Sequence, residues 1–327
     1  MNDETSSPLV SICIPVYNGE KFIAKAFESI SQQTYKNYEL VITNDGSTDN
    51  TEQVLNQELI NFGFKGTVFT IPNRGCEGAR DYACSKASGE FIAPLDIDDI
   101  WEPGYLENMI AAIQAKTDAG LIYCDFIDYD ERSGERVKKS DISPWIKLEK
   151  AENYQQDAYF FKKREFLGML FLGQVLFPSC TLFRKSLYDE SGGYWKEMQL
   201  QISTDWDFGL RVSLLSGIIY LDNPLLIKLR HDSNLSGNQL KTSECDIKVI
   251  RNLLSKYELT NTEINLAKDR LAARYYDAAY CYFMDKSNSK ARQYLFSSFM
   301  AKPNIRSIRL IIATLIPSFL IRLIKSS

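Results

Sequence analysis

The sequence predicts an α/β protein with a mostly parallel central sheet, followed by a C-terminal helical region. In the first 125 residues, short apolar runs alternate with stretches of helical periodicity, which is the pattern of strands joined by crossover helices. The runs are almost continuously apolar, as expected for parallel strands covered on both faces. Polar clusters follow the runs, and the carboxyl ends of parallel strands would bring these clusters to one edge of the sheet.

Each predicted strand is rich in β-branched residues and bounded by turn residues. The strands are expected at Leu9–Val16, Tyr38–Thr43, Gly66–Ile71, Glu90–Leu95 and Gly120–Asp125. The helices between them are expected at Glu20–Gln32, Thr48–Asn61, Gly78–Ala87 and Pro103–Ala115.

The remaining chain divides by composition. Residues 126–175 are rich in charged and aromatic residues and predict an irregular flap plus a helix, after which an apolar stretch at 174–183 and a helix near 204–216 return to the core. Residues 241–300 are helical throughout, and their aromatics at near-helical spacing ("ARYYDAAYCYF") indicate helix packing rather than a ligand site. We expect an α/β domain over residues 1–235, a helical region over 236–302 and a basic amphipathic tail over 303–327.

Charge is distributed unevenly. The net charge of −4 gives no reason to expect a nucleic-acid partner. Residues 286–327, however, hold eight Lys and Arg and no Asp or Glu, which leaves a net charge of −12 on residues 1–285. This asymmetry indicates that the two parts face different surroundings.

The seven cysteines are scattered and show no Cys-x-x-Cys spacing, so we expect neither a disulfide framework nor a zinc site. A reducing, cytoplasmic location fits this usage. The opening "MNDETSSPLV" has no basic region followed by an apolar core and does not resemble a secretory signal.

The tail resembles a membrane-surface segment. Its longest uncharged run, Leu310–Ile321, has 12 residues, whereas a spanning helix needs about 20, and Pro317 would kink it. Cations flank this run at Arg306, Arg309, Arg322 and Lys325, which favours contact with an anionic lipid surface on the inner face of the cell membrane. The alternative is a final helix packed on the body or on a second subunit.

Three carboxylates, Asp96, Asp98 and Asp99, crowd the end of the fourth predicted strand in "APLDIDDIW". A divalent cation among them would relieve their repulsion, and Mg²⁺ or Mn²⁺ typically takes one or two carboxylates together with phosphate oxygens. The stretch is not an EF-hand, and the chain has neither a P-loop nor a dinucleotide-binding glycine fingerprint. The alternative is a solvated turn. We favour a metal that neutralises a diphosphate leaving group.

The stretch "NDGSTDNT" follows the second predicted strand. Gly46 permits a tight turn, and Ser47, Thr48 or Asp49 can cap the next helix. This turn does not require Asp45, whose carboxylate could accept a hydrogen bond from the N–H of a uracil or thymine base.

In "TDWDF", both Asp205 and Asp207 could remove a proton from an acceptor hydroxyl, or either could cap a helix. The residues alone do not separate these roles. His231, the only histidine, could bind a metal or be an ordinary surface or core residue, and Arg230 beside it could pair with phosphate.

Three long stretches, "VSICIPVYNGEKFIAKAFESISQQTYKNYELVITNDGSTDNT", "NRGCEGARDYACSKASGEFIAPLDIDDIW" and "STDWDFGLRV", resemble family 2 glycosyltransferases in the order of that family's motifs. The resemblance covers residues 9–235 and implies a GT-A fold that binds a nucleotide-diphospho-sugar.

The resemblance also implies roles for individual residues. Pro15, Tyr17 and Asn18 would flank the base, Asp45 would read it, Arg80 would lie near the diphosphate, Asp96 near the ribose, Asp98 and His231 at the metal or diphosphate, and Asp205 would be the general base. The chain departs from the family pattern at Asn44, Asp81 and Thr204, where acidic, Asn and Glu residues are usual.

We therefore expect an inverting, Mn²⁺- or Mg²⁺-dependent glycosyltransferase of surface polysaccharide assembly. It would move a sugar from a UDP- or dTDP-sugar to a saccharide or lipid-linked saccharide. The alternatives are a nucleotidyltransferase, which should show a Gly-rich basic loop after the first strand, and a catalytically silent sugar-nucleotide-binding or scaffold protein.

Overall fold

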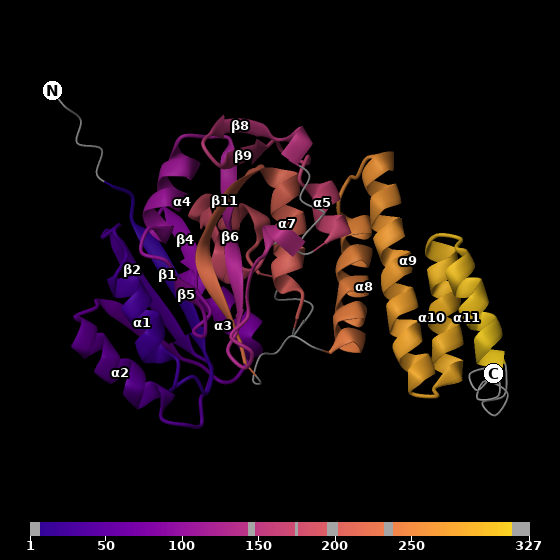
Figure 1. The fold of residues 1–327 in the computed structure, drawn as a ribbon, viewed down its shortest axis with the longest axis horizontal. Helices are drawn as coiled ribbons and strands as arrows, with labels where there is room; N and C mark the ends of the chain where they lie inside the picture. The colour runs from indigo at the N-terminus through magenta and orange to yellow at the C-terminus, as the bar shows by residue number, and fades with distance from the viewer. Residues whose placement is uncertain (1–6, 143–147, 174–175, 195–201, 232–237, 316–327) are drawn as a thin grey trace. The chain divides into compact units, whose positions relative to one another are not determined.

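The computed structural model describes residues 7–142, 148–173, 176–194, 202–231 and 238–315. The chain divides into two compact units, Met1–Asn234 and Leu235–Ser327, which are described separately. In Figure 1, the first unit is the indigo-to-orange part that contains every labelled strand, and the second contains helices α8 to α11.

The strands described in the first unit form one sheet. From edge to edge, its order is β3 (Gly66–Thr70), β2 (Tyr38–Asn44), β1 (Val10–Val16), β4 (Phe91–Pro94), β10 (Thr181–Arg184), β6 (Ala119–Asp130), β11 (Gly217–Arg230), β9 (Ala158–Phe161) and β8 (Glu152–Gln155). Two short strands lie off this path, because β5 (Ile100–Trp101) pairs with β11 and β7 (Arg136–Lys138) pairs with β6.

The four strands β3, β2, β1 and β4 are parallel, as predicted. Every residue of β1 and β4 is buried, which explains why their sequences are almost entirely apolar. Their carboxyl ends lie at one edge, so the polar clusters after β1, β2 and β4 meet there.

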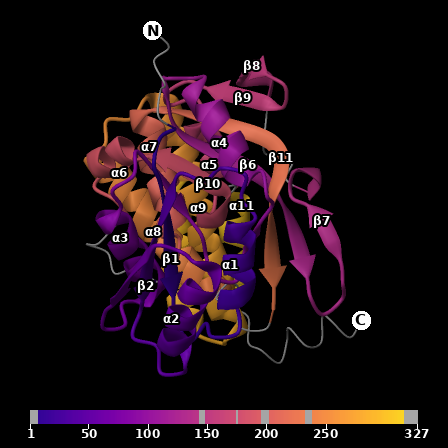
Figure 2. The same ribbon diagram turned by 90° about the vertical axis from the view of Figure 1, so that its left-hand side faces the viewer.

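The other half of the sheet was only partly predicted. Strand β6 runs on to Asp130, and β11 lies parallel to it over most of its length (Figure 2). The expected irregular flap over residues 126–175 is wrong in part, since this region contains β7, β8 and β9. These strands have only three or four residues each, and β7 and β8 are polar, so the sequence shows no clear apolar alternation there. β7 and β8 pair with neighbours in sequence, whereas β9 also pairs with the distant β11.

Helices connect and cover the sheet of the first unit. Helix α3 packs on β1 and β2, and α4 packs on β6 and β11. The helices of this unit are α1 (Ile23–Ser31), α2 (Thr51–Phe62), α3 (Gly75–Lys86), α4 (Tyr105–Gln114), α5 (Leu167–Leu172), α6 (Lys185–Ser191) and α7 (Thr204–Leu215). Short 3₁₀ turns occupy Ser140–Ile142, Leu148–Lys150 and Pro178–Cys180.

The second unit is helical where it is described. It consists of α8 (Gln239–Lys256), α9 (Asn261–Met284), α10 (Asn288–Ala301) and α11 (Ile305–Leu315). A capping box between Thr260 and Glu263 begins α9. Tyr276 and Phe283 pack against the buried cluster around Leu295, so the predicted role of the aromatic stripe in helix packing is confirmed.

Helix α11 has two unlike faces. Its buried positions include Leu310 and Ser307. The Ser307 hydroxyl donates a hydrogen bond to Ser298 Oγ of α10 at 2.9 Å. Four large apolar residues are exposed along the helix, at Ile305, Ile308, Ile312 and Leu315. The tail's later residues, including Pro317, Arg322 and Lys325, lie outside the described ranges. Among the described helices, none combines the length and the apolarity that crossing a bilayer would require.

Candidate active site

The loop that carries Asp96, Asp98 and Asp99 is fixed at its base. The Asp96 N–H donates to Ser179 Oγ at 3.0 Å, and the Trp101 indole N–H donates to Ser179 O at 2.7 Å. The Trp101 ring is buried and stacks on Tyr105 with a centroid separation of 4.2 Å. The acidic loop is therefore held from both sides by the turn that precedes β10.

Arg80 forms an ion pair with the first carboxylate of this loop. It is 2% exposed and donates to Asp96 Oδ1 at 2.7 Å and to Glu77 from the preceding turn of α3. The two carboxylates keep the pKa of Arg80 above its ordinary value, although burial acts in the opposite direction. Arg80 thus joins helix α3 to the acidic loop.

Asp98 faces the only histidine. Asp98 Oδ2 lies 3.1 Å from His231 Nε2, and the His231 ring stacks on Phe22 at 4.8 Å between centroids. Burial, and then the charge of Asp96, raise the pKa of Asp98. A carboxylate oxygen and an imidazole nitrogen at this separation are donors that suit Mn²⁺ or Mg²⁺. Within the described parts of the chain, no three or more His, Cys, Asp or Glu residues form a metal-binding group by themselves.

Asp45 lies at the tip of β2 and is 1% exposed. Its backbone N–H donates to Val16 O, and its Oδ1 accepts the Arg74 N–H at 2.7 Å. Its Oδ2 is buried and has no hydrogen-bond partner among the described residues. Burial raises the pKa of this carboxyl, and the Arg74 N–H partly offsets that effect. An unmatched buried acceptor is a feature that a ligand N–H would satisfy.

The residues predicted to flank the base, at the end of β1 and in the loop after it, have different environments. Pro15 is buried within β1, whereas Tyr17 is 48% exposed. Asn18 has a positive φ of 47° and accepts the Thr48 N–H at 2.8 Å, while its own N–H donates to Ser47 Oγ. Asn18 therefore ties the loop after β1 to the loop after β2, and Tyr17 stands beside this junction.

Asp205 lies in the first turn of α7, partly buried, and accepts the Trp206 N–H at 2.8 Å. Burial, followed by the negative charge of Glu77, raises the pKa of Asp205 to about 7. Glu77 itself accepts the hydroxyl of Thr204, the residue before Asp205. One carboxylate thus contacts both Arg80 and the beginning of α7.

Asp207 has a different environment. It is 2% exposed and pairs with Arg211 at 2.8 Å, and Arg211 also donates to the carbonyls of Ser191 and Gly193. The Asp207–Arg211 pair therefore anchors the end of α6. These contacts give Asp207 a structural role. The local sequence alone had left Asp205 and Asp207 equally able to act as a base or to cap the helix.

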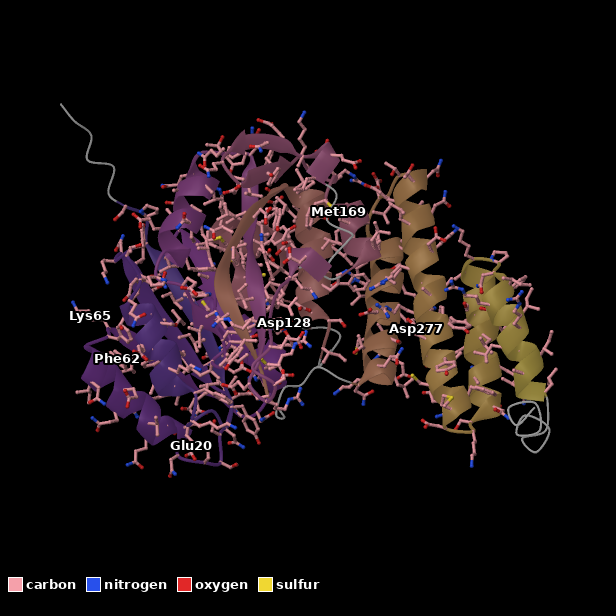
Figure 3. The ribbon with its side chains drawn as sticks, viewed as in Figure 1. Glu20, Phe62, Lys65, Asp128, Met169 and Asp277 are labelled. Carbon is pink, nitrogen blue, oxygen red and sulfur yellow. The ribbon has the colours of Figure 1, made fainter. Side chains whose placement is uncertain are left out.

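Arg230 forms a two-point ion pair with Asp128, through its Nε at 2.9 Å and through a second guanidinium nitrogen. Figure 3 labels Asp128, which lies on β6 beside β11. The Arg230 side chain is 52% exposed. Its charge is therefore already paired with a carboxylate, Asp128, that lies outside the Asp96–Asp99 loop.

Sequence reasoning missed Glu77, Ser179 and Asp128. Glu77 stands three residues before Arg80, a spacing that places both on one side of a helix and could have identified it. Ser179 and Asp128 carried no such local signal, since their partners lie far away in the chain.

Comparisons with known proteins all identify glycosyltransferases as similar to this chain. The family model described as Glycosyl transferase family 2 matches residues 11–192. The chain is 34% identical over 250 residues to an uncharacterized glycosyltransferase of Rickettsia typhi, covering 75% of this chain and 72% of that protein. It is 33% identical over 184 residues to the putative glycosyltransferase EpsH of Bacillus subtilis, covering 56% of this chain and 49% of that protein.

Two solved structures share the fold. TarS 1–349 of S. aureus in complex with UDP-GlcNAc superposes with a TM-score of 0.66 at 17% identity, over 90% of this chain and 81% of that one. The mannosyltransferase PcManGT from Pyrobaculum calidifontis, in complex with GDP-Man and Mn²⁺, gives a TM-score of 0.59 at 15% identity, over 94% of this chain and 80% of that one. The predicted GT-A fold is confirmed by this likeness.

The buried Asp207–Arg211 pair generates a stability prediction. Arg211→Met should lower the free energy of unfolding by about 3–5 kcal/mol, because it removes the cation that is paired with the buried Asp207 carboxylate. Lys185→Met is the matched control, since Lys185 and Asp189 form an i,i+4 pair of the same spacing at the surface, and it should cost less than about 1 kcal/mol. Urea unfolding followed by circular dichroism measures both, and equal losses would contradict a structural role for the buried pair.

Proposed function

The chain belongs to glycosyl transferase family 2, and from this premise we propose that it is an inverting, metal-dependent enzyme that moves a sugar from a UDP- or dTDP-sugar to a saccharide or lipid-linked saccharide. The observation that carries the mechanism is the Asp205 carboxylate, whose pKa is raised to about 7. A base with a pKa near the working pH can both accept and release a proton readily.

The donor would lie along the carboxyl edge of the parallel strands. Asp45 Oδ2, which is buried without a partner, would accept the N3–H of uracil or thymine. Tyr17, Pro15 and Asn18 would flank the base on the neighbouring loop. TarS 1–349 of S. aureus forms complexes with UDP and with UDP-GlcNAc, which supports a uridine donor by analogy.

The metal would be held by Asp98 and His231, whose donor atoms lie 3.1 Å apart. With phosphate oxygens completing its coordination, Mn²⁺ or Mg²⁺ would supply charge stabilisation to the diphosphate leaving group. Asp96, oriented by Arg80, would lie near the ribose. Arg230 would bind the diphosphate only if its guanidinium left the ion pair with Asp128 and paired with a phosphate instead.

In the reaction, Asp205 would take the proton from the acceptor hydroxyl. The hydroxyl oxygen would form a bond to the anomeric carbon while the bond from that carbon to the diphosphate oxygen breaks. The electron pair of the broken bond leaves with the nucleoside diphosphate. A single displacement of this kind inverts the anomeric configuration, and Glu77 would position Asp205 through Thr204 and raise its pKa.

The second unit would bring the enzyme to a membrane. The exposed residues Ile308 and Ile312 share a helix with Arg306 and Arg309, a combination that suits an anionic lipid surface. We place the enzyme in the cytoplasm, peripheral on the inner face of the cell membrane, where a lipid-linked acceptor for surface polysaccharide would be found.

The first test is calorimetric titration with UDP, dTDP, GDP and CMP, each with Mn²⁺ and with EDTA. UDP or dTDP should bind in the presence of metal, and Asp45→Asn should weaken that binding by about 10- to 100-fold, because an amide presents a donor where the base needs a charged acceptor. Asp49→Asn, in the same loop, is the control and should leave affinity within about twofold. Failure of every nucleotide to bind the folded protein would favour a silent scaffold.

The second test concerns the base. Asp205→Asn should abolish transfer and leave UDP affinity nearly unchanged. In the wild type, kcat/KM should rise with pH and reach half its maximum near pH 7, because only the deprotonated carboxylate accepts a proton.

Glu77→Gln should move this half-maximum to lower pH. The amide keeps an oxygen for the Thr204 hydroxyl but removes the negative charge that raises the pKa of Asp205. Glu52→Gln, at an exposed position of α2, is the control for charge removal. A pH profile that is the same in both variants would exclude coupling between Glu77 and Asp205.

A further test addresses the face of α11. Ile308→Ser combined with Ile312→Ser should reduce sedimentation with vesicles rich in phosphatidylglycerol by at least about 10-fold, since each buried side chain contributes roughly 1.5–3 kcal/mol. Ile60→Ser, which removes an isoleucine that is 75% exposed on α2, should have no effect. Undiminished sedimentation of the double variant would refute the lipid contact.

A further inference from the structure

Arg230 lies next to the proposed metal site and has a side chain that is free to turn. It is the last residue of β11 and immediately precedes His231, whose Nε2 lies 3.1 Å from Asp98 Oδ2. The Arg230 backbone is held, because its carbonyl accepts the Glu131 N–H at 3.2 Å. The Arg230 side chain, however, is 52% exposed. Because the stem of an arginine is long, this guanidinium can be directed either toward β6 or toward the proposed metal site.

In this structure the guanidinium is directed toward β6, where Asp128 binds it. Asp128 faces Lys228 in the register of β6 and β11, so Arg230, two residues further along, is its diagonal neighbour across the strands (Figure 2). The pair has two contacts, one from Arg230 Nε to Asp128 Oδ1 at 2.9 Å and one from a second guanidinium nitrogen to Oδ2. Asp128 is 7% exposed. The carboxylate is therefore the fixed member of the pair, and the guanidinium is the member that can move.

A second cation lies near Asp128. Lys139 follows β7, and its backbone N–H donates to Phe126 O of β6 at 2.9 Å. Burial lowers the pKa of Lys139, and the negative charge of Asp128, the next influence in size, opposes that effect. Removing the partner of a buried charge is strongly destabilising when nothing else compensates the charge. Because Lys139 lies within the electrostatic influence of Asp128, departure of Arg230 would leave this carboxylate with a neighbouring cation.

We propose that Asp128 and the diphosphate of the nucleotide compete for the Arg230 guanidinium. In the nucleotide-free protein Arg230 is bound to Asp128, and in the loaded protein it binds a phosphate oxygen. This inference rests on the proposed function, which supplies the diphosphate. The competition lowers the affinity for the nucleotide by the fraction of molecules in which Asp128 holds Arg230. It also favours departure of the nucleoside diphosphate after transfer, a step that limits the turnover of many enzymes.

The test is calorimetric titration of the full chain with UDP in the presence of Mg²⁺. Asp128→Asn should tighten UDP binding by about 3- to 10-fold, because the amide holds the guanidinium less strongly than a carboxylate does. Arg230→Gln should weaken binding by about 10-fold. The double variant should bind UDP no more tightly than Arg230→Gln alone. Asp130→Asn is the matched control, since it removes the same charge from a residue that pairs with Arg132, and it should change the affinity less than about twofold.

A second measurement leaves the ion pair intact. The ¹⁵N NMR signal of the Arg230 Nε–H group, assigned by its loss in Arg230→Gln, should shift when UDP and Mg²⁺ bind the wild type. Uridine, which carries no phosphate, should leave that signal unchanged.

Three results would overturn the inference. The Arg230 Nε signal could remain unchanged at saturating UDP. Asp128→Asn could fail to tighten UDP binding in a folded variant, as expected if the pair only stabilises the ends of β6 and β11. Asp128→Asn and Asp130→Asn could also tighten binding equally, which would indicate a general effect of charge. Failure of the wild type to bind UDP at all is a distinct outcome, since it would contradict the proposed function and this inference together.

Discussion

The buried guanidinium of Arg80 is the charge on which the acidic edge of this sheet depends. Asp96, Asp98, Glu77 and Asp205 approach one another where the parallel strands end, and like charges in a half-buried setting repel strongly. Arg80 compensates two of them directly, through Asp96 and Glu77. Asp98 and Asp205 have raised pKa values, because burial acts first and the negative charge of Asp96 or of Glu77 acts next. The crowding of carboxylates at this edge thus raises the proton affinity of the two residues proposed for metal binding and for proton transfer.

The scaffold fixes this edge through long-range contacts. Ser179 and Trp101 clamp the acidic loop, and the Tyr105 hydroxyl donates to Thr181 O at 2.9 Å. The loop after β4 is therefore held by residues about 80 positions further along the chain, in β10 and the turn before it. Contacts of this kind would pre-organise the proposed metal-binding loop before substrate binds.

The two units differ in where they place charged and apolar side chains. In the first, buried strands support a polar edge, and charged groups are compensated pairwise around it. In the second, the outward face of α11 carries isoleucines and a leucine, while small polar residues such as Ser307 face its neighbours. Leu310 of the same helix belongs to the buried cluster, so α11 presents apolar side chains both inward and outward. Exposed apolar surface of this kind favours contact with another apolar phase.

The sequence by itself determined the parallel half of the sheet and the acidic positions at its edge. Fully buried strands such as β1 are continuous apolar runs, and Asp45, Asp96 and Asp98 follow directly after such runs, so a local pattern suffices. Only the tertiary structure showed that Asp207 pairs with Arg211, because the local sequence around Asp205 and Asp207 does not encode which side chains will reach them. It also brought Glu77 to Thr204, which lies 127 residues further along the chain. No local periodicity encodes which distant side chains a folded sheet will bring into contact.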